Sequence, residues 1–266
     1  MQFGVSSYSF QPLLRRREIA LEGVFDQIAA SGGTHMELAT LTIGPGLDAM
    51  MDYELHDDAD TLARLRAAAA NSGIALSGLC IPASFIDEDP AARRAQIDRA
   101  KRYVDLCADL GVRFLRTDVV PWSLRPESYA QVESLFPVIT EACQELAAHA
   151  THRNVVTSIE NHGFLMNGSE RCRRLVHAVD NAHFRMTVDV GNFLCVDEDP
   201  LIATRACLDI ASYVHVKDFL LRKHRPGPGW LNTLGDRHIV GTVFGFGDVE
   251  TREIVRAVLA SGYDGF

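Results

Sequence analysis

The sequence lacks the features that would place it in a membrane or in the secretory pathway. No apolar run approaches the roughly 20 residues that a membrane-spanning helix needs. Residues 1–9 contain no basic segment followed by an apolar core, so no secretory signal is visible. We therefore expect no membrane association.

Positive charge is also scarce. The 26 Lys and Arg residues are outnumbered by 35 Asp and Glu residues, which gives a formal net charge of −9 and a pI near 5.5. Recognition of a nucleic acid needs clustered basic side chains. The charge balance therefore argues against a nucleic-acid partner.

Cysteine is present but forms no recognisable pattern. None of the six residues belongs to a C-x-x-C pair, and their wide spacing does not fit a disulfide framework. They are Cys80, Cys107, Cys143, Cys172, Cys195 and Cys207. Most lie in apolar surroundings, so we interpret them as small core residues of a reduced, cytoplasmic protein.

Short apolar runs alternate with longer amphipathic segments along the 266 residues. The predicted strands are Phe3–Ser7, His35–Leu38, Ala75–Cys80, Phe114–Thr117, Val155–Glu160, Phe184–Asp189 and Tyr213–Lys217. The predicted helices are Glu18–Ala30, Asp57–Asn71, Asp89–Leu110, Pro126–His149, Ser169–Val179, Pro200–Ile210 and Asp248–Ala260. Most strands are continuously apolar, as expected where helices cover both faces of a parallel sheet.

Four of the predicted helices end at a glycine, and an apolar run follows within a few residues. These glycines are Gly32, Gly73, Gly111 and Gly262. Glycine just past a helix end adopts the left-handed conformation that closes the last turn. Strands that alternate with helices in this way indicate right-handed βαβ units and a parallel sheet.

The number of repeats favours a closed barrel over an open sheet. Seven strand–helix pairs are visible in residues 1–266, and a (β/α)₈ TIM barrel has eight pairs in about 250 residues. We expect one domain whose eighth strand is missing or truncated after Phe266, with an incomplete C-terminus. The alternative is an open doubly wound sheet, but the first turn has no G-x-G-x-x-G.

The longest stretch predicted to be irregular is Phe219–Gly247, which contains two prolines and several glycines. It follows the seventh strand, so it would lie on the functional face of a barrel. Its basic run Arg222–Arg225, together with Trp230, suggests a cationic lid, although a solvated charge run is the alternative reading.

Three polar residues stand at or near the ends of consecutive strands. Glu160 and Asp189 close two apolar runs, and His215 lies in the next. Strand ends converge on one face of a barrel, where two carboxylates and an imidazole suit a divalent cation with open positions for substrate. Each residue taken singly is also explained as a helix cap or a salt-bridge partner.

The segments around these residues resemble the xylose isomerase-like TIM barrel superfamily, which includes sugar phosphate isomerases and epimerases and AP endonuclease family 2. The resemblance spans nearly the whole chain. The matching segments are Gly4–Phe10, His35–Leu38, Glu160–Gly163, Asp189–Asn192, Val214–Asp218, Gly241–Asp248 and Gly262–Gly265. Their order is specific to the superfamily but not to one substrate.

The resemblance implies a metal site of Glu, Asp, His and a final Glu. Glu160, Asp189 and His215 match the first three ligands, and the fourth has no counterpart before Phe266. The resemblance also makes Glu160 the candidate base. The donor set favours Mn²⁺, with Mg²⁺, Co²⁺ or Zn²⁺ as alternatives.

The implied activity is a metal-dependent isomerase or epimerase of a sugar or sugar derivative that works through an enediolate. Two alternatives remain open: a lyase that dehydrates an inositol-like ketone, and a sugar-binding member that has lost catalysis. A phosphodiesterase of the endonuclease IV kind is disfavoured by the acidic charge balance and the single-metal ligand set. The expected partner is a small sugar or polyol, and relatives are commonly homo-oligomers.

Further residues are candidates for supporting roles. His162 and Lys217 join Glu160 as candidate catalytic residues. Candidate substrate-binding residues are Glu37, Arg116, Asn192, Asp218 and Trp230. Each has a structural alternative, such as a loop histidine, a helix cap, or an ion pair between Arg116 and Asp118.

Overall fold

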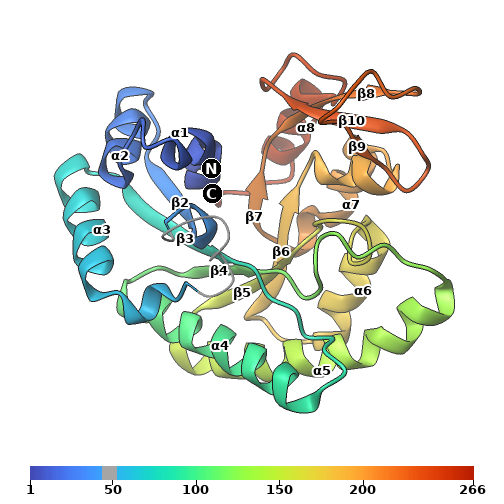
Figure 1. The fold of residues 1–266 in the computed structure, drawn as a ribbon, viewed down its shortest axis with the longest axis horizontal. Coiled ribbons are helices and arrows are strands. Elements are labelled where there is room, and N and C mark those ends of the chain that lie inside the picture. The colour runs from blue at the N-terminus through green and yellow to red at the C-terminus, as the bar shows by residue number, and fades with distance from the viewer. Residues whose placement is uncertain (44–52) are drawn as a thin grey trace.

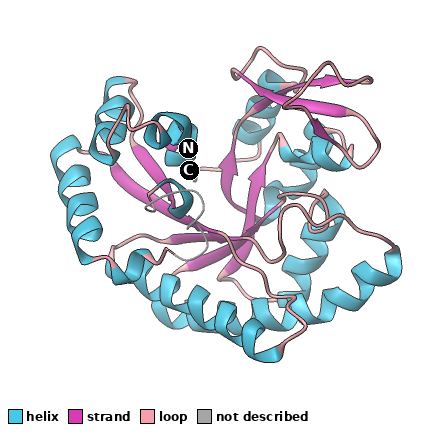
Figure 2. Ribbon diagram, in the orientation of Figure 1, coloured by secondary structure: helices cyan, strands magenta, loops and turns pink. Residues whose placement is uncertain are grey.

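The computed structural model describes residues 1–43 and 53–266, and its centre is a sheet of seven parallel strands (Figure 1). The strands follow chain order around the sheet: β1 (Gly4–Ser6), β2 (His35–Ala39), β3 (Ala75–Ile81), β4 (Phe114–Thr117), β5 (Val156–Glu160), β6 (Phe184–Asp189) and β7 (Ala211–His215). The sheet curls with its helices around the outside (Figure 2). This arrangement confirms the predicted TIM-barrel architecture.

Eight α-helices lie in the described part of the chain. They are α1 (Gln11–Arg15), α2 (Leu21–Ala30), α3 (Ala59–Ser72), α4 (Pro90–Asp109), α5 (Tyr129–Arg153), α6 (Ser169–Val179), α7 (Pro200–Cys207) and α8 (Thr251–Ala260). Short 3₁₀ helices occupy Ser7–Phe10, Thr40–Thr42, Leu55–Asp57, Asn192–Val196 and Leu208–Ile210. Of the helices in the described ranges, none is long and apolar enough to cross a bilayer.

The last residues of the chain lie between the two edges of the sheet. The Val214 amide on β7 donates to the Phe266 carbonyl at 3.1 Å, and the Gln2 amide beside β1 donates to the Gly265 carbonyl at 3.0 Å. Figure 1 places the C-terminus next to the N-terminus, beside β7. Gly265 and Phe266 therefore occupy the position of an eighth strand and link β7 to the start of the chain.

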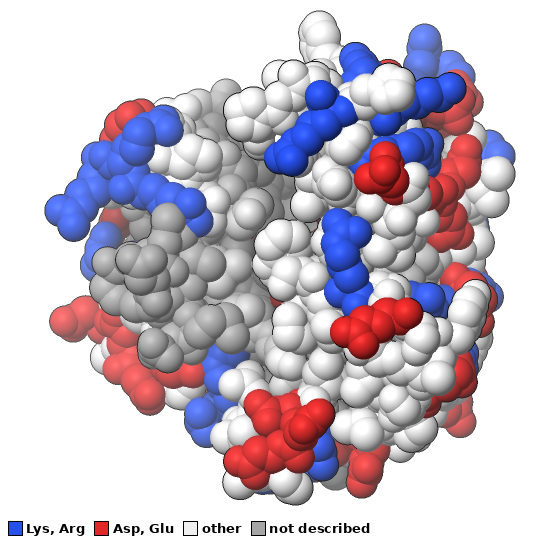
Figure 3. All heavy atoms as spheres, turned by 45° about the vertical axis from the view of Figure 1, so that its right-hand side comes forward, with Lys and Arg blue, Asp and Glu red and all other residues white. Residues whose placement is uncertain are grey.

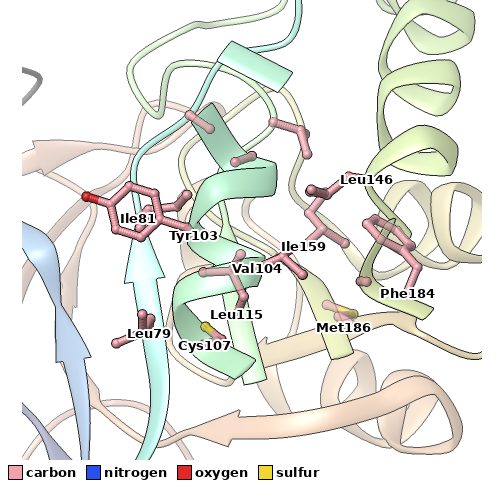
Figure 4. Packing of buried hydrophobic residues seen from close by; sticks show 14 of the residues in the cluster. Leu79, Ile81, Tyr103, Val104, Cys107, Leu115, Leu146, Ile159, Phe184 and Met186 are labelled. Atoms are coloured by element: carbon pink, nitrogen blue, oxygen red, sulfur yellow. The ribbon is translucent and has the colours of Figure 1, made fainter. Parts of the chain in front are cut away.

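The core lies between the sheet and its helices. Figure 4 shows Leu115 of β4 and Ile159 of β5 packed with Val104 of α4 and Leu146 of α5. All four side chains are at most 1% exposed. Because interiors are packed as densely as organic crystals, these contacts fix how the helices sit on the strands. The strand ends are thereby fixed as well.

Four of the six cysteines belong to this core, and none of the six forms a disulfide. All six thiols are free, and five of them are buried. Burial raises the pKa of the Cys107 and Cys143 thiols far above the ordinary value. These thiols are therefore protonated packing groups, as the sequence predicts.

The glycines predicted to close helices adopt the conformation that this role requires. Gly73 and Gly111 both have φ of +70°, in the left-handed region that costs other residues steric strain. Gly32 and Gly262 likewise have positive φ. The repeated helix–glycine–strand pattern is confirmed.

The prediction that Phe219–Gly247 is irregular is wrong. This stretch contains most of an antiparallel sheet with the order β8-β10-β9, formed by β8 (Asp218–Arg222), β9 (Leu231–Asn232) and β10 (His238–Thr242). Ile239 at its centre is fully buried with Val190 and Leu194. The paired strands β8 and β10 are short apolar runs. The prediction missed them because the prolines and glycines between them dominate the composition of the stretch.

The small sheet is fastened to the barrel by Asp218. This side chain is 2% exposed, and its carboxylate accepts hydrogen bonds from the backbone amides of Phe219, Gly245, Gly247 and Val249 at 2.7–3.1 Å. A Cβ on Gly247 would lie 2.1 Å from the carboxylate, so only glycine fits there. Asp218 therefore orders the glycine-rich segment that leads into α8.

We expect Asp218→Asn to lower the free energy of unfolding by about 3 kcal/mol, because an amide removes the charge and turns an N–H group towards backbone donors. Urea denaturation followed by circular dichroism measures this change. Asp236→Asn is the matched control, since Asp236 is exposed at φ +60°, which asparagine tolerates. Equal stability of the two variants would contradict the anchoring role.

Candidate metal centre

Three potential ligands meet at the carboxyl ends of adjacent strands. Glu160, Asp189 and His215 are the last residues of β5, β6 and β7, and Asp189 is paired with His215 in the sheet register. One potential ligand atom from each side chain lies within 4.8 Å of the other two. The three side chains therefore lie close enough together to contact one ion.

The seventh strand is displaced from its predicted range, and the displacement defines the site. The strand spans Ala211–His215 instead of Tyr213–Lys217. His215 therefore ends the strand, Val216 is 48% exposed, and the Lys217 side chain reaches Asp189. Apolar character alone misplaced this strand because Val216 continues the run without being buried.

His215 lies among three acids. Its Nδ1 is 3.1 Å from Glu160 Oε1 and 4.0 Å from Asp189 Oδ2, whereas its Nε2 is 3.0 Å from Glu37 Oε1. Histidines that ligate metals commonly donate their other ring nitrogen to a carboxylate, which fixes the tautomer. The Glu37 contact provides this arrangement. Glu37 therefore orients His215, whereas the sequence suggested it as a substrate-binding residue.

Asp189 uses its two oxygen atoms differently. Oδ1 accepts hydrogen bonds from the backbone amides of Gly191 and Asn192 at 3.0 and 3.1 Å. Oδ2 lies 2.9 Å from the Lys217 ammonium, which also donates to Asn192 Oδ1 at 2.6 Å. The backbone therefore fixes the carboxylate, and one oxygen faces cationic groups.

Arg116 neutralises the other side of the cluster. Its guanidinium contacts both Glu160 Oε2 and Asp118 Oδ1, and the side chain is only 6% exposed. Asp118 Oδ1 also lies 2.8 Å from His162 Nδ1. Asp118, Glu160 and His162 thus form a second group of potential ligands, but the guanidinium already supplies positive charge to it.

The segment after Glu160 is shaped by its neighbours. The Asn161 side chain donates to the Asp189 carbonyl and accepts from the Asp189 amide, both at 2.8 Å, so it ties the ends of β5 and β6 together. Gly163 has φ +73°, and a Cβ there would lie 2.0 Å from the Trp122 carbonyl. Only glycine therefore lets the loop after β4 approach His162.

The charged groups shift one another's pKa values. Burial alone would raise the pKa of Glu160, but Arg116 and His215 hold it well below its ordinary value. Burial raises the pKa of Asp189, and Lys217 opposes the rise only in part. Burial would lower the pKa of His215, yet Glu37 and Glu160 raise it well above the ordinary value. Glu160 is therefore ionised at neutral pH.

The residues present fit a divalent cation. Glu160 Oε1, Asp189 Oδ2 and His215 Nδ1 offer two hard oxygens and one imidazole nitrogen, a donor set that suits Mn²⁺, Mg²⁺ or Zn²⁺. Binding requires a neutral imidazole, so a cation would take the place of the proton between His215 Nδ1 and Glu160, while Nε2 keeps its contact with Glu37. Three protein ligands leave positions open for substrate oxygens.

Most of the predicted site residues lie together. Glu37, Arg116, Glu160, His162, Asp189, Asn192, His215 and Lys217 are joined by the contacts described above. The predictions for Asp218 and Trp230 as substrate-binding residues find no such support. Asp218 binds backbone amides, and Trp230, half-buried before β9, makes no hydrogen bond or ring contact to the cluster among the described residues.

The predicted cationic lid lies on the small sheet. Arg222 pairs with Asp248 at 2.8 Å, whereas Lys223, His224 and Arg225 are exposed. Figure 3 shows basic side chains gathered on this side of the molecule. A role over substrate stays a prediction.

The sequence did not reveal the contacts that two residues, Asp118 and Trp122, make with His162. Asp118 was considered only as an ion-pair partner of Arg116, but it also holds His162. Trp122, 49% exposed, stacks on His162 with ring centroids 6.4 Å apart. Their position just after the fourth predicted strand was the available signal, because strand ends converge at the mouth.

The family of the chain is established by comparison. The family model described as xylose isomerase-like TIM barrel matches residues 25–266. The chain therefore belongs to this family, as the motifs around Glu160, Asp189 and His215 indicate.

Individual relatives are distant. L-ribulose-5-phosphate 3-epimerase UlaE of Salmonella heidelberg (strain SL476) is 21% identical over 214 residues, covering 74% of this chain and 72% of that protein. D-psicose 3-epimerase from Clostridium cellulolyticum H10, solved with D-tagatose, is 17% identical and covers 100% of this chain and 83% of its own, with a TM-score of 0.70.

A second solved structure includes a metal ion. The xylose isomerase-like TIM barrel protein from Mycobacterium smegmatis, in complex with magnesium, is 17% identical, with a TM-score of 0.68. The match covers 99% of this chain and 88% of that one. At such identities, the two structural likenesses establish the fold alone.

We expect Arg116→Met to lower the free energy of unfolding of the metal-free protein by about 3–5 kcal/mol, because it leaves Glu160 and Asp118 buried without their cation. Arg94→Met is the control: it removes an ion pair with Glu145 on the surface, where solvent screens the charges and the pair contributes little to stability. Urea denaturation compares the two variants. Similar losses would show that the buried guanidinium carries no special charge-compensating role.

Proposed function

We propose that the protein is a divalent-metal-dependent isomerase or epimerase of a sugar or sugar derivative. The observation that carries the proposal is the set of Glu160, Asp189 and His215 at adjacent strand ends, with His215 backed by Glu37. The family and the epimerases among the relatives support it.

The metal would be held by Glu160 Oε1, Asp189 Oδ2 and His215 Nδ1, with Mn²⁺ as the first candidate. When bound, a divalent cation polarises a substrate carbonyl and stabilises the negative charge of an enediolate. The magnesium in the mycobacterial neighbour supports a divalent ion in this family. The side chains of this chain supply the remaining chemistry.

We assign proton removal to Glu160, whose depressed pKa keeps it ionised at neutral pH. It takes the proton from the carbon next to the carbonyl, and the electron pair of that C–H bond moves into the enediolate. His162 is the second proton-transferring group, because Asp118 holds its Nδ1 and leaves Nε2 for the substrate. The exposed indole of Trp122, stacked on His162, offers an apolar wall for a sugar face.

The fate of the enediolate decides the reaction class. Return of the proton to the same carbon from the opposite side gives an epimer, and return to the neighbouring carbon gives an isomer. Loss of a hydroxide from the adjacent carbon would instead give a dehydrated product. We favour proton return because epimerases occur both among the curated relatives and among the solved structures.

The setting of the protein is also a proposal. We propose that residues 1–266 fold as one domain, since α8 and the small sheet pack onto the same barrel through Ile239 and Ile254. The six free thiols support a reducing, cytoplasmic compartment. A homo-oligomer stays a prediction from the family.

We expect Glu160→Gln to reduce proton exchange about 10³-fold, because the neutral amide can neither accept the proton nor supply a charged ligand oxygen. The assay incubates free ketohexoses, ketopentoses and their phosphates with protein and Mn²⁺ in D₂O, and follows deuterium at the carbon next to the carbonyl by NMR.

Glu88→Gln is the control, since Glu88 is exposed on the segment before α4. It should keep the wild-type exchange rate. A folded Glu160→Gln protein with undiminished exchange would remove Glu160 from the reaction. A product that has lost water, formed at a rate that depends on Glu160, would favour the lyase.

A further inference from the structure

Several contacts fix the position of the Lys217 side chain beside the candidate ligands. Its ammonium lies 2.9 Å from Asp189 Oδ2 and 2.6 Å from Asn192 Oδ1. A Cβ on Gly191 would lie 2.7 Å from the Lys217 Cγ, so the absence of a side chain there makes room for the lysine stem. The Lys217 ammonium lies 5.3 Å from the centroid of the Phe219 ring.

The ammonium and a metal ion need the same oxygen atom. Asp189 Oδ1 is used by two backbone amides, which leaves Oδ2 as its potential ligand atom, 4.0 Å from His215 Nδ1. Lys217 contacts this same Oδ2. Two cations at one carboxylate oxygen repel each other, and here the Asp189 side chain is 4% exposed while that of Lys217 is 37% exposed.

Asn192 offers the ammonium a second partner. Its Oδ1 accepts from Lys217, while its Nδ2 lies 3.4 Å from Glu160 Oε1. The amide is therefore oriented by both groups, and Lys217 keeps one acceptor when it releases Asp189. An ammonium with three donors would then have two donors for substrate oxygens.

We propose that Lys217 is a resident counter-cation that a divalent metal displaces from Asp189. In the metal-free protein its ammonium neutralises Asp189. With a divalent ion held in the site, Oδ2 would be its ligand and Lys217 would keep its contact with Asn192, with its other donors turned to substrate oxygens. The inference rests on the proposed function, and it implies that Lys217 weakens metal binding while it assists turnover.

The test measures Mn²⁺ affinity by isothermal titration of the metal-free full-length chain. We expect Lys217→Met to bind Mn²⁺ at least tenfold more tightly than wild type, because the competing charge is gone. Lys101→Met is the matched control, since it removes another ammonium paired with a carboxylate, that of Glu145 on the outer helices. It should bind Mn²⁺ as wild type does.

A second readout separates this role from simple packing. With Mn²⁺ saturating, Lys217→Met should lose turnover about 10²-fold even though it holds the metal more tightly, since a donor to the developing charge is missing. If Lys217→Met does not fold without metal, Lys217→Gln and the rate at which excess chelator strips Mn²⁺ from loaded protein replace the titration. Slower release from the variants supports the proposal.

The outcomes distinguish the inference from the function on which it rests. Equal or weaker Mn²⁺ binding by both Lys217 variants, with wild type binding the ion, overturns the counter-cation while leaving the metal site intact. Failure of every protein to bind Mn²⁺ overturns the proposed function and this inference together. If Lys217→Met binds Mn²⁺ more tightly but turns over substrate as wild type does, the proposed contact between Lys217 and substrate oxygens is overturned.

Discussion

Three buried carboxylates and a fourth, partly buried one at the mouth of one barrel are the constraint on which the rest of the site depends. Glu37, Glu160 and Asp189 are each at most 6% exposed, and the Asp118 side chain is 12% exposed. A buried charge without compensation costs several kcal/mol. Each of the four must therefore contact a cation or an array of hydrogen-bond donors, and the surrounding residues follow from that need.

The compensating groups come from several strands, so the charge balance and the fold depend on each other. Arg116, the penultimate residue of β4, contacts Glu160. His215, which ends β7, contacts Glu37 and Glu160, and Lys217 reaches Asp189. Parallel strands in chain order bring these ends together, which is why residues 55 positions apart, such as Glu160 and His215, come within 3.1 Å. We propose that a metal ion takes its place among these pairs by displacing Lys217 from Asp189.

Backbone geometry at two glycines makes these contacts possible. Gly163 admits the loop after β4, and with it Trp122, against His162. Gly191 leaves room for the Lys217 stem. Both follow a metal-ligand candidate by two or three positions, so the motifs Glu160–Gly163 and Asp189–Asn192 encode close packing as well as chemistry.

Sequence periodicity predicted the barrel because its strands are continuously apolar and its helices end at glycine. Phe114–Thr117, Phe184–Asp189 and Ser169–Val179 were predicted with the bounds that the structure has. The small sheet was not foreseen, because its short strands lie in a stretch rich in glycine and proline. The seventh strand was shifted because hydropathy does not distinguish exposed Val216 from buried residues.

For the site, the sequence identified the acids and bases but not their partners. The positions of the strand ends pointed to Glu160, Asp189 and His215. Only the structure shows that Glu37 contacts His215 and that Asp118 contacts His162. These pairs connect strands that are distant in the chain, and no local pattern specifies them. The contacts of Asp218 were hidden for the same reason, since three of its four backbone donors lie 27–31 residues further along.

The central claim is that Glu160, Asp189 and His215 hold one divalent cation. Crystals of the full chain grown with Mn²⁺ test it directly through anomalous scattering at the manganese absorption edge. The account predicts one strong peak about 2–2.5 Å from a carboxylate oxygen of Glu160, a carboxylate oxygen of Asp189 and a ring nitrogen of His215. A map with no peak among these three side chains at saturating Mn²⁺ would contradict it.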